Sequence, residues 1–233
     1  MEKNIKKEIA FAAADALIKD NMKLGLGTGS TACWVAERLA EHLKSGKIKS
    51  IHAVATSYNT RLDCERLGIR LTGLGDPALG NRLDLTIDGA DEIDPERRLI
   101  KGGGGALLLE KIIAYASAAY AVVATDNKLV PHLGATFAVP VEVIPEALSL
   151  VREKLLSLGA REAVLRTPPN FAGPVYTDHG NLILDTRFAR IDDPPALERD
   201  LKAIPGVVES GIFTNPVTHL FIGHADGRVE HRA

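Results

Sequence analysis

Three short stretches of this 233-residue chain combine residue types that do chemistry, and the first is LGLGTGST at residues 24–31. Glycine occupies every second position from residue 25 to residue 29, and Ser30 and Thr31 add hydroxyl groups just before a helical pattern. Glycine weakens a strand, so such a run marks a place where something comes close to the backbone. Free N–H groups and the dipole at the start of a helix favour an anion, typically a phosphate. By itself the stretch is equally compatible with a glycine-rich turn that caps a helix.

Two nucleotide-binding motifs come close to this stretch without matching it. A P-loop requires GxxxxGK[ST], and no lysine follows the glycines here. The dinucleotide motif GxGxxG requires a last glycine where this chain has Ser30. The sequence therefore disfavours a redox enzyme that uses a dinucleotide, an alternative that a nicotinamide-binding test decides.

The second stretch is TIDGADEID at residues 86–94, which places four acids within seven residues after an apolar strand. Asp88 and Asp91 lie three residues apart around Gly89 and Ala90, so a tight turn aims both carboxylates the same way. Acids at a strand end accept hydrogen bonds from sugar hydroxyls, act as acid–base groups or bind magnesium. The spacing does not match an EF-hand, and a solvated acidic turn is the alternative interpretation.

The third stretch is LIKGGGGALLLEK at residues 99–111, whose four consecutive glycines at 102–105 cost backbone entropy. Such a run indicates backbone amides that line a pocket, which Lys101 enters from one side. Glu110 follows on a largely apolar helix, and a carboxylate in partly dry surroundings has a raised pKa that suits a general base. The alternative is an ion pair between Glu110 and a nearby lysine on the helix surface.

The first half of the chain alternates strand-like and helix-like segments, which predicts parallel strands joined by right-handed crossovers. We expect strands at 23–27, 51–55, 83–87 and 120–125, and helices at 5–17, 31–43, 57–67 and 106–116. Ser57 is the expected N-cap of the third helix, and Gly68 is its expected stop. Because ligands gather at the carboxyl ends of such strands, the three stretches are expected to follow three strands of one sheet. The segment TDNK at 125–128 follows the next strand, and Lys128 there is either a further phosphate contact or an ordinary loop lysine.

The pattern changes after about residue 130. Segments then follow in the order β-α-β-β-α, which is typical of a small α+β module. The tail reads as strands with an Asp-Gly turn at 226–227. We therefore expect a catalytic domain made of residues 1–130 and 208–233, and a smaller domain at 131–207 that serves oligomerisation.

Composition argues against several classes of function. Hydrophobic residues make up 45% and charged residues 25% of the chain, ordinary values for a globular protein with a core. The formal net charge of -2 and the lack of a basic stripe argue against nucleic acid as a partner. No stretch is long and apolar enough to span a membrane, and no signal-peptide pattern is present. Cys33 and Cys64 match no metal-ligand or CxxC spacing, so we expect a cytoplasmic protein without a disulfide framework or zinc site.

An ordered set of motifs resembles the ribose-5-phosphate isomerase family, type A. The set comprises GLGTGST, DGADEID, IKGGGGAL with a following EK, VPVEVIP and AIPGVVESGIF, and it extends from residue 25 to residue 213. The resemblance implies an aldose–ketose isomerase of the pentose phosphate pathway that interconverts D-ribose 5-phosphate and D-ribulose 5-phosphate, through a cis-enediolate and without metal or cofactor. It also implies an α/β fold, with a Rossmann-like, mostly parallel sheet domain, a second, smaller α+β (ferredoxin-like) domain, and assembly as a homodimer or homotetramer.

The resemblance also implies roles for individual residues. Glu110 is the implied proton acceptor, and residues 101–104 are implied to form the wall near the reacting carbons. There Lys101 and the amides of the glycine run are expected to stabilise the developing oxyanion. Asp88 and Asp91 are implied to contact sugar hydroxyls or to aid ring opening. The implied substrate-binding residues are Thr28, Gly29, Ser30, Thr31, Lys7, Lys128, Asp88, Gly89, Ala90, Asp91, Lys101, Gly102, Gly103 and Gly104.

This chain departs from the family pattern at several places. Gly105 stands where alanine is common, and Leu109 stands where a polar or basic residue is frequent. The segment 166–181 is compressed or altered. Lys6 and Lys7 are adjacent, so either is a candidate to reach the phosphate.

Two other kinds of protein remain as alternatives. A related sugar-phosphate enzyme, such as an amino-sugar-phosphate deaminase or a phosphosugar lactonase, also uses a glycine-rich phosphate loop, but DGADE together with KGGGGA disfavours it. A non-catalytic sugar-phosphate sensor normally carries a basic DNA-binding motif, which this sequence lacks, and the presence of Lys101 and Glu110 favours catalysis. Comparing several phosphosugars as substrates discriminates between these possibilities.

Overall fold

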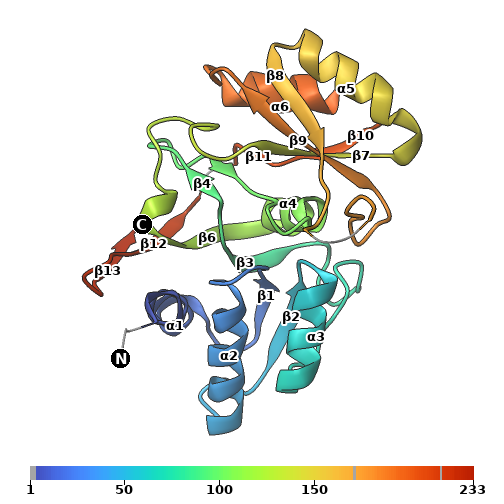
Figure 1. Ribbon diagram of the computed structural model, residues 1–233. Helices are drawn as coiled ribbons and strands as arrows, with labels where there is room; N and C mark the ends of the chain where they lie inside the picture. The colour runs from blue at the N-terminus through green and yellow to red at the C-terminus, as the bar shows by residue number, and fades with distance from the viewer. Residues whose placement is uncertain (1–3, 170–171, 216) are drawn as a thin grey trace. The chain divides into compact units, whose positions relative to one another are not determined.

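Figure 1 shows the computed structural model, which describes residues 4–169, 172–215 and 217–233. The chain divides into two units. Unit 1 comprises Met1–Ala90, Leu109–Lys128 and Pro216–Ala233, and unit 2 comprises Asp91–Leu108 and Leu129–Asn215. Two of the points where the chain passes from one unit to the other, after Ala90 and after Leu108, therefore fall inside the second and third stretches.

The described part of unit 1 contains a six-stranded sheet in the order β13-β12-β6-β3-β1-β2. Its strands are β1 (Met22–Leu26), β2 (Ile51–Ala55), β3 (Leu83–Asp88), β6 (Ser117–Thr125), β12 (His219–Gly223) and β13 (Val229–Arg232). All neighbouring strands are parallel except β12 and β13. The predicted parallel sheet is confirmed, and the carboxyl ends of β1, β2, β3 and β6 lie at one edge of it.

Helices cover both faces of this sheet. They are α1 (Ile5–Leu17), α2 (Cys33–Ser45), α3 (Tyr58–Leu67) and α4 (Leu107–Tyr115). One buried core joins Ile9 of α1 and Val35 of α2 to Leu24 of β1. Side chains alternate along a strand, so Gly25 faces the other way, where Ile113 of α4 lies. No helix among the described residues has the length and apolar character that a membrane crossing needs.

Helix α3 begins and ends where the sequence predicts. Ser57 is its N-cap, and the side-chain oxygen accepts a hydrogen bond of 3.0 Å from the N–H of Thr60. Gly68 ends the helix with a left-handed φ of 74°. These local signals therefore fix the segment that follows β2.

The main sheet of unit 2 is antiparallel, in the order β10-β7-β9-β8. Its elements along the chain are β7 (Val139–Val143), the 3-10 turn η2 (Pro145–Ala147), α5 (Leu148–Ser157), β8 (Ala160–Leu165), β9 (Leu182–Phe188), α6 (Pro194–Lys202) and β10 (Val207–Ser210). Val151 of α5 and Leu201 of α6 are buried in one core with Val141 and Leu184 of the sheet. This β-α-β-β-α-β order is the ferredoxin-like arrangement, so the predicted fold class is confirmed.

A second sheet of unit 2 changes the expected domain boundaries. Its antiparallel strands are β4 (Glu92–Ile93), β5 (Leu99–Ile100) and β11 (Ile212–Phe213), in the order β11-β5-β4. Because β5 pairs with β11, both strands belong to unit 2 and not to the domain expected at 1–130 and 208–233. The glycine run therefore follows a strand of this small sheet, and the expectation that all three stretches follow one sheet is wrong.

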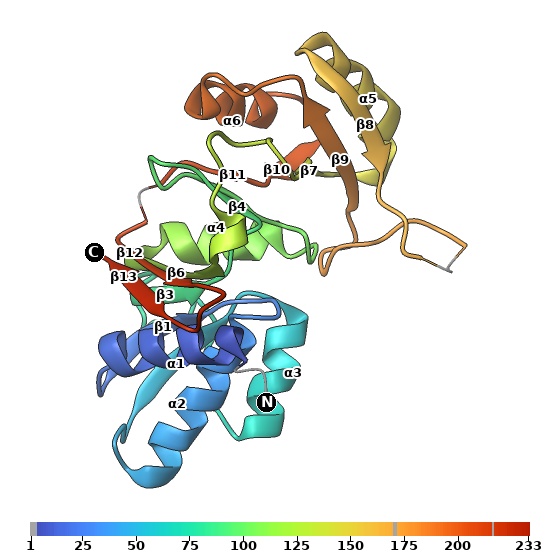
Figure 2. The same cartoon turned by 60° about the vertical axis from the view of Figure 1, so that its left-hand side comes forward.

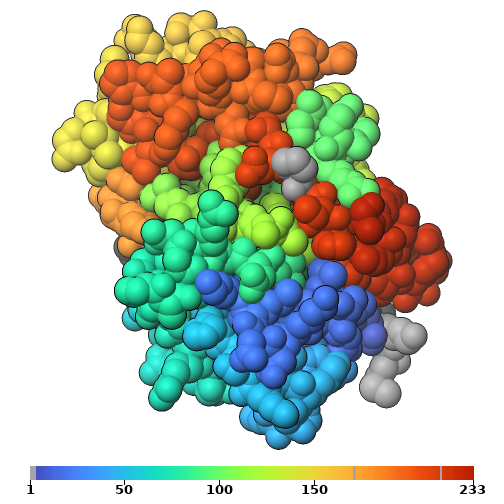
Figure 3. Space-filling view, turned by 180° about the vertical axis from the view of Figure 1, so that it is seen from behind, coloured from blue at the N-terminus to red at the C-terminus, as the bar shows by residue number. Residues whose placement is uncertain are grey.

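Unit 1 brings the two ends of the described chain together. Helix α1 packs against β12 and β13, and Figure 3 shows the red C-terminal segment beside the blue N-terminal helix. Figure 2 shows β12 and β13 as a hairpin at one edge of the sheet. Gly227 in its turn has a φ of 86°, as the Asp-Gly signal predicts.

Candidate active site

The first glycines of the first stretch are required by the strand beside them. A Cβ atom on Gly25 would lie 2.0 Å from Thr86 Oγ1, and one on Gly27 would lie 2.3 Å from Asp88 Oδ1. Any larger residue would therefore push β1 away from β3. Gly29 differs, because its φ of 108° is one that other residues rarely adopt. What comes close to the first two glycines is thus protein, and the loop after Gly27 remains as the candidate anion site.

The hydroxyl of Thr28 enters a cluster of hydroxyls that sequence reasoning misses. Its Oγ1 lies 2.7 Å from Thr56 Oγ1, 2.8 Å from Ser57 Oγ and 3.0 Å from Thr60 Oγ1. The available signal was TSYNT at 56–60, where hydroxyls follow the carboxyl end of the adjacent strand β2. The side chain of Thr28 therefore anchors the loop to the residues after β2 and fixes the loop backbone at this position.

The exposed Ser30 meets a cation. Lys6 of α1 donates a hydrogen bond of 2.8 Å from Nζ to Ser30 Oγ. Lys7 has a different environment, because its Nζ lies 4.9 Å from the ring centroid of Phe11 and 5.2 Å from that of Trp34. Of the two candidate lysines, Lys6 therefore contacts the anion loop, and Lys7 contacts the two aromatic rings.

Asp88 ends β3, and its side chain is fully buried. Oδ1 accepts hydrogen bonds from the N–H of Thr28 at 3.0 Å and from the N–H of Gly89 at 2.7 Å. A buried carboxylate needs such donors to offset the loss of water. The bonds tie the acidic stretch, which continues through the half-buried Ala90, to the anion loop of the same unit.

Glu110 lies in the first turn of α4 and is only 5% exposed. Ile113 is one turn further along the same side of the helix, and a Cβ on Gly25 would lie 2.7 Å from its Cγ2. This side of α4 therefore faces the sheet surface that carries Gly25 and Asp88. Because α4 leads into the amino end of β6, its first turn lies toward the carboxyl edge of the sheet.

Lys128 ends the 3-10 turn η1 (Asp126–Lys128), which follows β6, and its side chain is half-buried. Asp126 Oδ2 lies 3.2 Å from His224 Nδ1, and His224 Nε2 lies 3.1 Å from Glu230 Oε2. These contacts tie the turn to the β12–β13 hairpin. Lys128 therefore lies at the same edge of the sheet as Asp88.

In unit 2, a hydrogen bond joins Asp91 to the glycine run. The N–H of Gly103 donates to Asp91 Oδ2 at 2.8 Å, and the N–H of Asp91 donates to the carbonyl of Ile100 at 2.8 Å. A Cβ on Gly103 would lie 2.9 Å from Asp91 Oδ1, so a larger residue would displace the carboxylate. The glycine run and Asp91 are therefore built as one piece.

Lys101 is 2% exposed although its side chain is a cation. Its backbone N–H donates to the carbonyl of Gly211 at 2.9 Å, and its Nζ lies 5.7 Å from the ring centroid of Phe213. A Cβ on Gly211 would lie 2.3 Å from the Lys101 carbonyl oxygen. The glycine of ESGIF is thus required by a close approach of two chain segments, which sequence reasoning misses.

The glycine run forms a tight turn with an exposed apex. Gly102 and Gly105 have φ values of 100° and 78°, and the N–H of Gly105 donates to the carbonyl of Gly102 at 3.0 Å. Gly103 and Gly104 are exposed between them. An alanine at position 105 would have an unfavourable positive φ, and its Cβ would lie 3.3 Å from Ile183 Cδ1. The glycine at this departure from the family pattern therefore relieves strain.

The remaining acids of the second stretch hold structure. Glu92 is fully buried and accepts four hydrogen bonds of 2.5–2.7 Å from residues 134–137. Asp94 is paired with Arg98 at 2.6 Å. Both carboxylates hold neighbouring loops in place. We therefore assign them a structural role, unlike Asp88 and Asp91.

The predicted site residues are divided between the two units. Unit 1 holds Thr28, Gly29, Ser30, Thr31, Lys7, Asp88, Gly89, Ala90, Glu110 and Lys128. Unit 2 holds Asp91, Lys101, Gly102, Gly103 and Gly104. Within the described ranges, no group of three or more His, Cys, Asp or Glu side chains is arranged to hold a metal ion. Of the altered segment 166–181, residues 170 and 171 lie outside the described residues.

Comparison with protein families matches residues 52–227 to the family of ribose 5-phosphate isomerase A, also called phosphoriboisomerase A. Similar proteins include the ribose-5-phosphate isomerase A of Treponema denticola, which is 48% identical over 97% of both chains. That of Trichormus variabilis is 44% identical over 96% of this chain and 93% of its own.

Solved structures resemble this chain over its whole length. The ribose 5-phosphate isomerase A of Methanocaldococcus jannaschii has a TM-score of 0.91 at 38% identity, covering 100% of this chain and 99% of its own. A D-ribose-5-phosphate isomerase in complex with phospho-erythronic acid has a TM-score of 0.92 at 42% identity, with the same coverage.

Proposed function

This chain belongs to the ribose 5-phosphate isomerase A family and interconverts ribose 5-phosphate and ribulose 5-phosphate, and we propose that Glu110 is the base that moves the proton. The observation that carries this proposal is the burial of Glu110 at the start of α4. The first turn of α4 lies toward the carboxyl edge of the unit 1 sheet, as do the anion loop and Asp88, and a buried titratable group at such an edge is a candidate for catalysis.

The reaction moves one proton between adjacent carbons. A carboxylate removes it from C2 of the aldose and returns it to C1 of the cis-enediolate, while the proton of the C2 hydroxyl passes to O1, so that C2 becomes the carbonyl carbon. A positioned base of this kind typically contributes ~10²–10⁴-fold to the rate. Glu110 serves both steps, because the proton it accepts stays on the carboxyl group until the enediolate takes it back.

Negative charge grows on the carbonyl oxygen as the proton leaves. Lys101 supplies a cation with little competing water, and the amides of the glycine turn supply donors on a rigid backbone. Losing one such donor typically costs about 3 kcal/mol of transition-state stabilisation.

The phosphate takes no part in the chemistry, but its binding energy places the sugar. The amides at Gly29–Thr31 and the hydroxyls of Ser30 and Thr31 receive it at the start of α2. Lys6, whose Nζ already lies 2.8 Å from Ser30 Oγ, supplies the charge. Lys128 adds a second cation at the same edge of the sheet.

Asp88 and Asp91 accept hydrogen bonds from the sugar hydroxyls, and one of them assists opening of the furanose ring. Hydrogen bonds that hold both carboxylates in place support this proposal. The N–H groups of Thr28 and Gly89 donate to Asp88, and the N–H of Gly103 donates to Asp91. Gly89 and Ala90, which lie between the two aspartates in the sequence, have small side chains and so let the backbone approach the sugar.

The test is conversion of ribose 5-phosphate by the purified protein in a chelator, alongside Glu110→Gln and the control Glu65→Gln. Glu65 is an exposed glutamate of α3. We expect the control to match the unchanged protein, and Glu110→Gln to lose conversion of ribose 5-phosphate. Near-normal turnover of Glu110→Gln rejects the base, whereas inactivity of the folded, unchanged protein contradicts the assigned reaction itself.

We also propose that the enzyme acts in the cytoplasm, in the pentose phosphate pathway, as a homodimer or homotetramer. Cys33 and Cys64 are both free thiols, which suits a reducing compartment. Val164 and Tyr176 of unit 2 are large apolar side chains exposed in the single chain, which supports assembly. Light scattering tests the assembly, and a monomer at working concentration contradicts it.

A further inference from the structure

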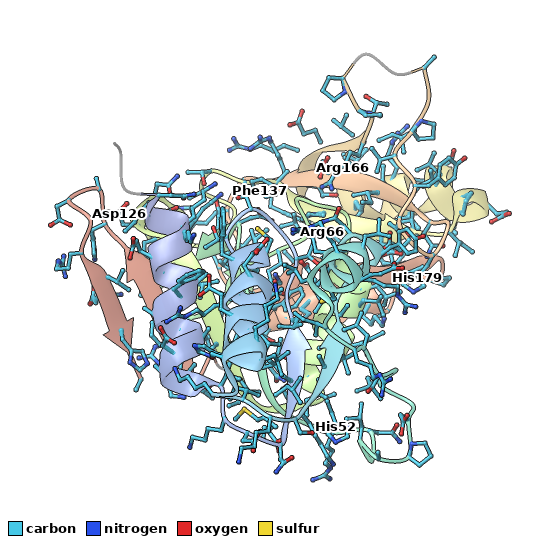
Figure 4. The ribbon with its side chains drawn as sticks, turned by 90° about the horizontal axis from the view of Figure 1, so that it is seen from below. His52, Arg66, Asp126, Phe137, Arg166 and His179 are labelled. Atoms are coloured by element: carbon cyan, nitrogen blue, oxygen red, sulfur yellow. The ribbon has the colours of Figure 1, made fainter. Side chains whose placement is uncertain are left out.

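Arg166, which directly follows β8 and is labelled in Figure 4, contacts the carbonyl side of the glycine turn. Its Nη1 donates to the carbonyl oxygens of Gly102 at 2.8 Å and Gly103 at 3.1 Å. Its Nε and Nη2 donate to the two carboxylate oxygens of Asp185 at 2.9 and 2.5 Å. One guanidinium thus links β9 to two successive peptide groups, all within unit 2.

The guanidinium is itself held firmly. The backbone N–H of Arg166 donates to the carbonyl of Ile183, and its carbonyl accepts from the N–H of Val175, both at 2.9 Å. The two-bond pairing with Asp185 fixes the plane of the side chain. The side chain is only 14% exposed, so water competes little for these bonds.

Because the peptide group is planar, these contacts to carbonyl oxygens also fix the directions of the N–H groups that follow them. In a trans peptide the C=O and the following N–H point in opposite directions. Holding the Gly102 carbonyl toward Arg166 therefore points the Gly103 N–H away from it, where Asp91 accepts at 2.8 Å. Holding the Gly103 carbonyl in the same way points the Gly104 N–H away from the guanidinium, at the exposed apex of the turn.

The Gly102 carbonyl also accepts from the Gly105 N–H and the Gly103 N–H is held by Asp91, so the peptide between Gly103 and Gly104 depends most on Arg166. Glycine adopts positive and negative φ with similar ease, and each of these peptide groups lies between two glycines. A flipped peptide would present a carbonyl oxygen where the reaction needs a donor. Donors that stabilise a developing charge are most effective when they need no reorganisation.

We propose that Arg166 is a positioning residue of the isomerase, which fixes the orientation of the Gly103 and Gly104 amides and, through Gly103, of Asp91. The inference rests on the role proposed above for the glycine turn. Arg166 stands behind the turn and leaves the phosphate loop of unit 1 unchanged. Its loss therefore lowers kcat much more than it changes KM.

The experiment measures kcat, KM and thermal stability for Arg166→Ala, Arg166→Lys and Asp185→Asn. The matched control is Arg187→Ala, an exposed arginine of β9 that lines the same pocket and pairs with Glu162 at 3.2 Å. Misplaced catalytic groups cost about 10²-fold, so we expect about that loss of kcat for Arg166→Ala. A lysine cannot make the forked set of bonds, so Arg166→Lys and Asp185→Asn should fall between Arg166→Ala and the control.

Added guanidinium distinguishes positioning from stability. Arg166 lines a pocket of about 380 Å³ together with Gly103, Asp185 and Arg187, so a small guanidinium salt has access to the vacated position. At concentrations that leave the melting temperature unchanged, it should restore part of the kcat of Arg166→Ala and none in the control. If Arg166→Ala does not fold, kcat of Arg166→Lys and Asp185→Asn is the deciding measurement.

Two results overturn the proposal. One is a folded Arg166→Lys or Arg166→Ala protein that keeps the kcat of the control. The other is a loss of kcat that follows the loss of thermal stability and is not restored by guanidinium. Gly104→Pro, which removes the apex N–H, separates the two levels of the argument. Full kcat in Gly104→Pro rejects the glycine amides as donors, whereas a loss there with normal Arg166 variants rejects the role of Arg166 alone.

Discussion

The backbone N–H of Thr28 donates a hydrogen bond of 3.0 Å to Oδ1 of Asp88, so the carboxylate that ends β3 fixes the first residue of the anion loop after β1. The side-chain hydroxyl of Thr28 reaches the hydroxyls that follow β2. Three neighbouring strand ends are thus locked together by two polar groups of one threonine, before any substrate arrives.

Two substitutions of Asp88 separate anchoring from charge. Asp88→Asn keeps an oxygen for the Thr28 N–H, whereas Asp88→Ala leaves a buried donor unsatisfied at a cost of about 1–3 kcal/mol. We expect both to lower kcat, and only Asp88→Ala to weaken the affinity for ribose 5-phosphate, measured as an increase in KM. Asp84→Asn, an exposed position on the same strand, is the control. Unchanged ligand affinity in a folded Asp88→Ala protein contradicts the anchoring role.

Lys6 and Lys7 should differ in their effect on KM. A hydrogen bond to a charged group is worth about 1.5–3 kcal/mol, so Lys6→Met is expected to raise KM for ribose 5-phosphate by roughly 10–100-fold. Lys7→Met removes a contact with the Phe11 and Trp34 rings and should change KM much less. Steady-state kinetics and competition by inorganic phosphate measure both effects, and the reverse order of the two variants refutes the assignment.

Glu92→Gln should destabilise the protein without touching the substrate. The carboxylate accepts four hydrogen bonds from residues 134–137, and an amide would turn an N–H₂ group toward one set of donors. We expect a loss of about 2–3 kcal/mol, which lowers the melting temperature by roughly 5–10 °C. Glu96→Gln, at an exposed neighbour, should melt as the unchanged protein does. Equal melting temperatures for the two variants exclude the structural role of Glu92.

The network around Asp15 predicts a stability that depends on acid pH. Burial by itself would raise the pKa of Asp15, but hydrogen bonds and charges from Arg38 and Lys47 outweigh it and hold the pKa at about 2, below the ordinary 3.8. The stabilisation is therefore present above about pH 4 and is lost as the pH falls toward 2. Because the side chain is 36% exposed, we expect about 0.5–1 kcal/mol.

Urea unfolding of Asp15→Asn at several pH values measures this contribution. The difference in unfolding free energy between Asp15→Asn and the unchanged protein should become smaller as the pH falls from 5 to 2. Arg38→Met removes the main partner, so Asp15→Asn in that background should show a smaller gap at every pH. A gap that stays constant down to pH 2 contradicts the depressed pKa.

The sequence predicts the elements whose signals are local. The alternation of strands and helices, the Ser57 cap, the Gly68 stop and the Asp-Gly turn each depend on neighbouring residues, and each is found in the structure. The division into units depends instead on the pairing of β5 with β11, which are more than a hundred residues apart and two residues long. Such short strands carry no periodicity, so the boundary was not predictable from pattern.

The site shows the same limit. Several site residues can be recognised from residue type and spacing alone, namely the anion loop, Asp88, Asp91, Lys101 and Glu110. Arg166 is one arginine in an irregular segment, and only the folded chain brings it to the carbonyls of Gly102 and Gly103. Likewise, Gly25 and Gly27 are explained by side chains of β3, which no reading of β1 alone reveals.

The order of strands in the six-stranded sheet has a consequence for how the chain is made. β6 is bordered by β3, which is synthesised before it, and by β12, which emerges about a hundred residues later. Until β12 leaves the ribosome, the apolar strand β6 has one open edge, a template for pairing with other chains. A chain that stops before His219 is therefore expected to aggregate, and the rate of translation over residues 129–218 sets how long the nascent protein depends on chaperones.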